Sequence, residues 1–165
     1  MAKHALNETL SFVVLLCAFL ALALVPGCEK TSPEAKALLS VGTISAKERA
    51  LSFEQIKGKL HAKDTADEAA LQNFIGTHGA GLNSQAVALA DLVEAVQKAG
   101  KLSKAARDQV TAAVATAQSR VEEWALIVPK LQLDEPLAKW VAGHGEGLSA
   151  QHDSLKKLSV ALQKK

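Results

Sequence analysis

The sequence has no tyrosine, and phenylalanine and tryptophan together make up only 4% of its 165 residues. Aromatic platforms that stack on nucleic-acid bases or on sugars are therefore scarce. Charge of one sign is also lacking, because 19 Lys and Arg stand against 17 Asp and Glu, for a formal net charge of +2. A near-neutral chain has no basic footprint for nucleic acid, so nucleic acid is not expected as a partner.

Catalytic patterns are missing as well. The sequence contains no glycine-rich phosphate loop, no serine nucleophile placed between a strand and a helix, and no Glu-x-x-His pair of the type that holds di-metal centres. Its only cysteines are Cys17 and Cys28. We therefore expect a protein that is not an enzyme and that carries no cofactor.

One long hydrophobic run is present near the start of the chain. Residues 10–25 read LSFVVLLCAFLALALV and are almost all apolar. A membrane-spanning helix needs about 20 such residues, whereas the hydrophobic region of a secretory signal needs about 7–15. Pro26 and Gly27 follow and would end a helix. The length favours an export signal peptide over residues 1–27, with an uncleaved signal anchor as the alternative.

The segment Val25-Pro26-Gly27-Cys28 resembles the lipobox of bacterial lipoprotein precursors, in which a small residue directly precedes the cysteine. Pro26 departs from the small or aliphatic residue that is usual at its position. The resemblance covers residues 1–28 and implies cleavage before Cys28, which would carry the lipid that anchors the protein in the cell envelope. Because Glu29 is not Asp, the resemblance implies the periplasmic face of the outer membrane in a Gram-negative host.

After Cys28, abundant alanine and few β-branched runs favour helices, and capping residues divide them. We expect residues 28–44 to hold the lipidated cysteine, a tether and a short helix that stops near Gly42. Further helices are expected over 46–61, over 66–98, from 103 to about 127, and from 135 almost to 165. The residues expected to cap or end the helices are Ser32, Ser45, Asp64, Ser103 and Asp134 at starts and Gly100 at an end.

Two of these helices are copies of each other, because residues 73–98 match residues 139–164 at a spacing of 66. The matched pairs include Phe74 and Trp140, His78 and His144, Gly79 and Gly145, Gly81 and Gly147, and Gln85 and Gln151. Upstream, a weaker match places Phe53, Glu54 and Ile56 against Val121, Glu122 and Trp124. A duplicated αα-hairpin, with halves at about 45–100 and 103–165, predicts an all-α four-helix up-down bundle over 45–165.

The apolar stripe of each copied helix contains one histidine, His78 or His144, and one glutamine, Gln85 or Gln151, two turns further on. In an up-down bundle these two helices are diagonal and parallel, so the histidines should face each other across the core. Such a pair could hold a haem iron or a transition metal, or could respond to pH or to a partner. The preferred interpretation is a buried, hydrogen-bonded polar pair that fixes the register of the bundle.

These features favour a small, lipid-anchored, non-enzymatic envelope protein whose helical domain binds or scaffolds a protein partner. One alternative is a haem- or metal-binding bundle that uses His78 and His144. Another is a periplasmic helical protein held by an uncleaved signal anchor.

Overall fold

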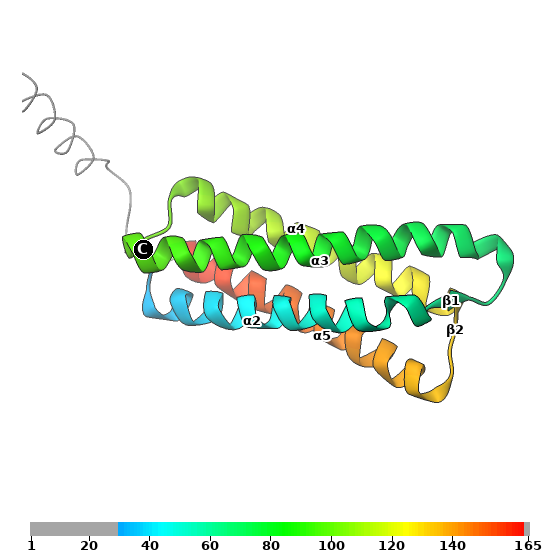
Figure 1. Ribbon diagram of the computed structural model, residues 1–165. Coiled ribbons are helices and arrows are strands. Elements are labelled where there is room, and N and C mark those ends of the chain that lie inside the picture. Colours follow the sequence, from blue (N-terminus) through cyan, green and yellow to red (C-terminus); the bar gives the residue numbers. More distant parts are fainter. Residues whose placement is uncertain (1–29, 164–165) are drawn as a thin grey trace, which may run out of the picture.

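The computed structural model describes residues 30–163, which form four long helices in an up-down-up-down bundle (Figure 1). The helices are α2 (Pro33–Ile56), α3 (Thr65–Ala99), α4 (Lys104–Ile127) and α5 (Glu135–Gln163). The expected all-α, four-helix fold is confirmed. The expected signal peptide and Cys28 lie outside the described residues. Within residues 30–163, none of the helices combines the length and hydrophobicity that a membrane crossing requires.

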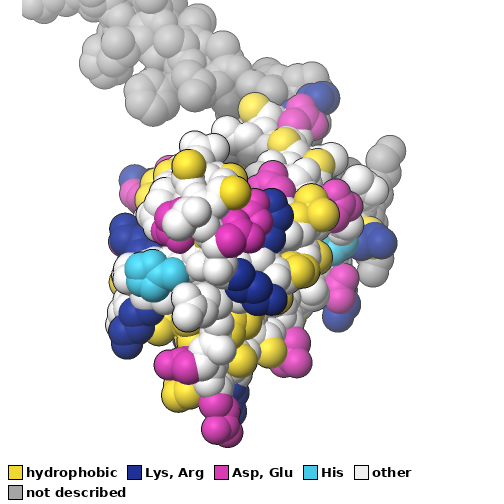
Figure 2. All heavy atoms as spheres, turned by 90° about the vertical axis from the view of Figure 1, so that its right-hand side faces the viewer, with side chains coloured by type: hydrophobic (Ala, Val, Ile, Leu, Met, Phe, Trp, Pro, Cys, Tyr) yellow, Lys and Arg dark blue, Asp and Glu magenta, His cyan; other side chains and the backbone are white. Residues whose placement is uncertain are grey.

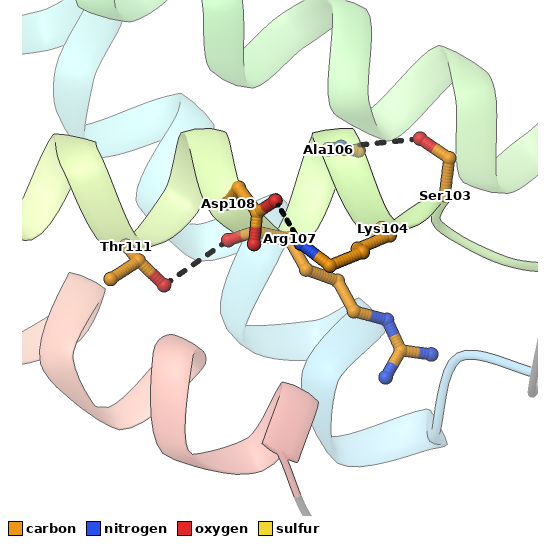
Figure 3. Close-up of polar contacts among 6 residues, drawn as sticks. All are labelled: Ser103, Lys104, Ala106, Arg107, Asp108 and Thr111. Carbon is orange, nitrogen blue, oxygen red and sulfur yellow. Dashed lines mark hydrogen bonds and ion pairs between the residues drawn. The ribbon is translucent and has the colours of Figure 1, made fainter.

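Side chains that precede the helices satisfy their first backbone N–H groups, as the sequence predicted. A serine hydroxyl accepts a hydrogen bond at the start of α2 and α4, and an aspartate carboxylate does so at the start of α3 and α5. Figure 3 shows this at the start of α4, where Lys104 also forms an ion pair with Asp108 at 2.7 Å. The four bonds are Ser32 Oγ from Ala35 N (3.1 Å), Asp64 Oδ1 from Asp67 N (3.0 Å), Ser103 Oγ from Ala106 N (3.1 Å) and Asp134 Oδ1 from Leu137 N (2.9 Å). Gly100, with φ 70°, ends α3 as expected.

The expected break near Gly42 is wrong, because α2 is one continuous helix. Gly42 costs about 1 kcal/mol relative to alanine inside a helix, and Ser45 would suit a cap. Packing overrides both local preferences, since a buried face against α3 and α5 continues through this point. The buried apolar residues and glycine of that face are Ala35, Leu39, Gly42, Ala46, Ala50 and Phe53.

The continuous α2 also corrects the register of the repeat. α2 ends at Ile56 and is followed by the 3₁₀ turn Lys57–Lys59, just as α4 ends at Ile127 and is followed by the turn Val128–Lys130. These elements match at a spacing of 71, so the expected match of Ile56 with Trp124 is wrong. A single spacing fails because α3 has four extra residues at its start relative to α5, and the connection before α3 is one residue longer than the one before α5. The matched pairs include Ser32 and Ser103, Leu39 and Val110, Ala46 and Ala117, Arg49 and Arg120, and Phe53 and Trp124.

Short connections hold the ends of the bundle together. The two-residue strands β1 (His61–Ala62) and β2 (Leu131–Gln132) pair in antiparallel fashion and join the two inter-helix loops. Figure 2 views this end, where acidic and basic side chains are interspersed with scattered hydrophobic ones. At the opposite end, Arg107 Nη1 donates to Leu162 O at 2.9 Å, which ties the start of α4 to the last turn of α5.

The four helices do not contact their neighbours equally. α2 packs closely against α3 and α5, and α4 packs closely against α5. Of the four pairs of neighbouring helices, α3 and α4 pack least closely, and α3 and α5 are not such a pair. α3 and α5, the copied helices, are therefore diagonal. The seam between α2 and α5 and the seam between α4 and α3 both join the two halves, and the repeat makes them equivalent positions in the fold.

Candidate functional site

The structure places His78 of α3 and His144 of α5 against each other in the core, as the repeat predicted. Their Nε2 atoms are 3.1 Å apart, the distance of a hydrogen bond. The two residues are only 3% and 2% exposed. Neither Nδ1 atom has a hydrogen-bond partner among the described residues. In a neutral pair one Nε2 carries the hydrogen and the other accepts it, so the two rings must be opposite tautomers.

The histidine pair is enclosed by every phenylalanine and tryptophan of the described residues. Phe74 and Trp124 stack on His78, with ring centroids 4.9 and 5.4 Å away, and Trp140 stacks on His144 at 4.8 Å. Phe53 contacts both histidines, with its ring edge-on to His78 at 4.7 Å and tilted against His144 at 5.6 Å. The few aromatic residues of the folded part therefore form one cluster around the imidazoles.

Both imidazoles are neutral over the physiological pH range. Burial, followed by repulsion from His144 and Arg120, lowers the pKa of His78 to about 3. Burial, followed by repulsion from Arg49 and Arg120, lowers the pKa of His144 to about 4. Removal from water disfavours the charged form, and the aromatic neighbours offer no counter-charge.

Two glycines in each copied helix make room for side chains of the other helices. A Cβ atom at Gly145 would lie 3.1 Å from the Trp124 ring, and one at Gly79 would lie 3.3 Å from Phe53 Cε1. A Cβ atom at Gly81 would lie 3.3 Å from the guanidinium of Arg120, and one at Gly147 would collide with the guanidinium of Arg49. The repeated glycines therefore admit an aromatic ring from the same half and an arginine from the other half.

A layer of four polar side chains crosses the bundle next to the histidines. Each helix contributes one of them, namely Arg49, Gln85, Arg120 and Gln151, and the layer separates two clusters of buried hydrophobic residues. Gln85 and Gln151 are buried as predicted. The two arginines were not predicted to take part. Their signal was present, since each lies four residues before the aromatic residue of its helix, Phe53 or Trp124.

The two halves use this layer differently. In the seam between α4 and α3, Arg120 Nη1 donates to Gln85 Oε1, and Arg120 Nη2 donates to Gly81 O at 3.2 Å. In the equivalent seam between α2 and α5, Arg49 Nη1 donates to Gly143 O at 3.3 Å. The side-chain amide of Gln151 has no hydrogen-bond partner among residues 30–163. The bond between arginine and glutamine is therefore made in one seam only.

The seam between α3 and α4, which we call the open seam, contains a groove of about 450 Å³. Gly81, Gln85 and Arg120 lie at one end of the groove, and its walls are mostly small or apolar. The wall residues include Ala88, Leu89, Leu92, Val110, Ala112 and Ala113. A second hollow of about 480 Å³ continues the open seam on the other side of Arg120, beside Phe74, Thr77 and Glu123.

The seam between α2 and α5, which we call the closed seam, is filled at the corresponding places. Trp140 Nε1 donates to Ser52 Oγ at 2.9 Å, whereas the equivalent residues of the open seam, Phe74 and Glu123, form no such bond. Leu38 packs on the hydrophobic core, whereas its equivalent Gln109 is exposed beside the groove. These differences in residue type accompany the groove in the open seam and the filled positions in the closed seam.

The histidine pair does not have the spacing of a haem site. Two imidazoles on opposite sides of one metal ion would place their nitrogens about 4 Å apart, with bonds of about 2.0–2.1 Å each. The 3.1 Å between Nε2 atoms fits a direct hydrogen bond instead. Within residues 30–163, no three His, Cys, Asp or Glu side chains cluster as metal ligands would.

No protein-family model matches the chain, and no curated protein and no solved structure matches it either.

Proposed function

We propose that this chain is a lipid-anchored, non-enzymatic envelope protein whose helical bundle binds a small, largely apolar molecule in the open seam. The groove between α3 and α4 carries this proposal, because its volume of about 450 Å³ lies within the range of small-molecule sites, about 300–1,000 Å³. Mostly apolar walls with a few convergent polar groups at one end are typical of such sites.

A binding role is supported over catalysis by the state of the histidines. Their Nε2 atoms bond to each other, both rings are buried, and both lowered pKa values keep them neutral. A general base must reach a proton on a substrate. Neither imidazole is presented to the groove, whose polar residues include Gln85 and Arg120 instead.

The anchor is tested by the Cys28→Ser variant in a bacterial host. The lipobox resemblance predicts that this variant remains at precursor mass and takes up no labelled palmitate. The parent protein should be cleaved to its mature mass and should take up the label. Normal processing of the variant would contradict the lipid anchor and leave the binding role standing.

Binding is tested by native mass spectrometry of the full-length protein released from detergent micelles. We expect a small-molecule adduct that survives in the parent protein and is lost in Ala88→Trp, because the indole would fill the groove. Ala115→Trp is the control, since Ala115 is exposed on α4 and does not line the groove. An adduct that persists equally in both variants, or no adduct at all, would contradict binding in the open seam.

A further inference from the structure

Arg120 is a buried cation without a counter-ion. The residue is only 5% exposed, and its hydrogen bonds go to the neutral oxygens of Gln85 and Gly81. No carboxylate of residues 30–163 forms an ion pair with it. Burial lowers the pKa of the guanidinium, and only the more distant Glu123 acts against this. A buried charge that lacks a paired opposite charge is costly, so the site favours an anion.

The groove extends from this charge as an apolar channel. Gln85 and Leu92, which both line it, are separated by about 10 Å along the helix, at about 1.5 Å per residue. Leu89 and Leu92 form one wall, and Val110 and Ala113 form the other. The exposed residues Asp91 and Gln109 lie toward the end that is remote from Arg120.

We propose that the groove binds a single-chain amphiphile with a carboxylate head, such as a long-chain fatty acid. This proposal rests on the proposed function above and adds the chemical class of the ligand. The carboxylate contacts the guanidinium of Arg120, and the hydrocarbon chain lies between Leu89, Leu92 and Val110. An arginine binds a carboxylate through two parallel N–H···O bonds, which are stronger than bonds to neutral acceptors.

Charge balance favours a carboxylate over a phosphate monoester. One buried guanidinium carries one positive charge, which one carboxylate neutralises. A phosphate monoester carries about −1.5 to −2 at neutral pH and would leave excess negative charge in the seam. Gln85, which lies beside Arg120 at this end, is an uncharged amide that can rotate to offer its N–H₂ group to the same head group.

The equivalent arginine provides an internal comparison. Arg49 lies in the closed seam, where Gly147 receives its guanidinium and Trp140 bonds to Ser52. The same residue type at the equivalent position is therefore not expected to bind the ligand.

The experiment uses full-length protein in phosphatidylcholine nanodiscs and two photoreactive probes. One probe is a diazirine analogue of palmitate, and the other is the matching hexadecanol. After illumination, mass spectrometry measures labelling of residues 81–92 and 109–120 relative to the rest of the bundle. We expect the acid to label these segments about tenfold more than the alcohol, the effect of one charge-assisted contact. Arg120→Gln should abolish the preference, and the control Arg49→Gln should keep it.

Equal labelling by acid and alcohol would overturn the proposal while leaving a binding role for the groove. Labelling by neither probe would overturn both. An unchanged preference in a helical, folded Arg120→Gln would also overturn it. The comparison of acid with alcohol is made on the parent protein, so it decides the question even if that variant fails to fold.

Discussion

The two seams between the halves start from the same plan and end differently. Each brings an arginine from the first helix of one half to a glycine and a glutamine on the second helix of the other half. The closed seam is filled by a hydrogen bond between Trp140 and Ser52, whereas the open seam keeps a groove of about 450 Å³. The shared histidine pair lies between the seams. The comparison shows that a duplicated core can be kept while one of the two seams between its halves contains a groove.

The aromatic cluster around the histidines should be equally sensitive to substitution in both halves. Phe53 and Trp124 occupy equivalent positions and are 0% and 4% exposed. Replacing either by alanine removes a large buried ring, so we expect each change to lower the free energy of unfolding by about 3–5 kcal/mol. Chemical denaturation followed by circular dichroism measures this. A loss confined to one of the two variants would show that the cluster is not shared.

Acid should weaken the fold through both histidines. Their pKa values of about 3 and 4 lie below the unfolded value of about 6.5, so the unfolded chain binds more protons between these limits. The free energy of unfolding therefore has its full value above pH 6.5. It falls as the pH is lowered toward 4, by about 1.4 kcal/mol per pH unit for each histidine. Denaturant titrations between pH 7 and 4.5 test the slope.

The double variant His78→Leu, His144→Leu is the control for this slope. It removes the buried polar pair and should be at least as stable as the parent at neutral pH, because no partner is left unpaired. Its stability should depend less steeply on pH, since leucine, unlike histidine, takes up no proton in the unfolded chain. An identical slope in parent and double variant would assign the acid sensitivity to other groups.

The two arginines should differ in what they contribute. Arg120→Ala removes the hydrogen bonds to Gln85 and Gly81 from a buried place, and we expect a cost of about 2 kcal/mol. Arg49→Ala removes one 3.3 Å bond from a half-buried side chain and should cost less than about 1 kcal/mol. Urea unfolding of the two variants at one pH compares them directly. Equal costs would mean that the seams are energetically alike.

Neighbouring glycines of α5 should respond in opposite directions to alanine. A Cβ at Gly145 meets the buried Trp124 ring at 3.1 Å, so Gly145→Ala should cost about 1 kcal/mol in spite of the better helix propensity. A Cβ at Gly143 meets nothing within 4 Å, so Gly143→Ala should stabilise by up to about 1 kcal/mol. Thermal unfolding of the pair is sufficient, and a stabilising Gly145→Ala would contradict the close contact with Trp124.

The sequence predicted the features that depend on local signals or on the repeat itself. Caps at Asp64, Ser103 and Asp134 depend on residues within one turn, so they could be recognised without a structure. The facing of His78 and His144 follows from the duplication, because equal positions on diagonal parallel helices lie at one level. The continuity of α2 could not be found in this way, since Gly42 and Ser45 favour a break that only packing overrides.

The open seam could not be predicted because its width depends on side chains from two helices at once. The two seams have different residues at equivalent positions, Leu38 against Gln109 and Trp140 against Phe74, and neither difference changes a signal for where a helix begins or ends. Arg120 interrupts an apolar stripe, and its burial follows from a glycine on a helix that is remote in the sequence. A search for residue types shared at a spacing of 71 would have paired Arg49 with Arg120, among other matches.

The central claim, that Arg120 of the open seam binds a carboxylate, is tested most directly by carbon-13 NMR of carboxyl-labelled palmitate with the full-length protein in nanodiscs. Pairing with a guanidinium lowers the pKa of a carboxyl group, whereas desolvation at a membrane surface raises it. We predict a bound resonance, distinct from the membrane pool, that titrates at lower pH than that pool and is absent in Arg120→Gln. A single resonance that titrates identically with both proteins would contradict the account.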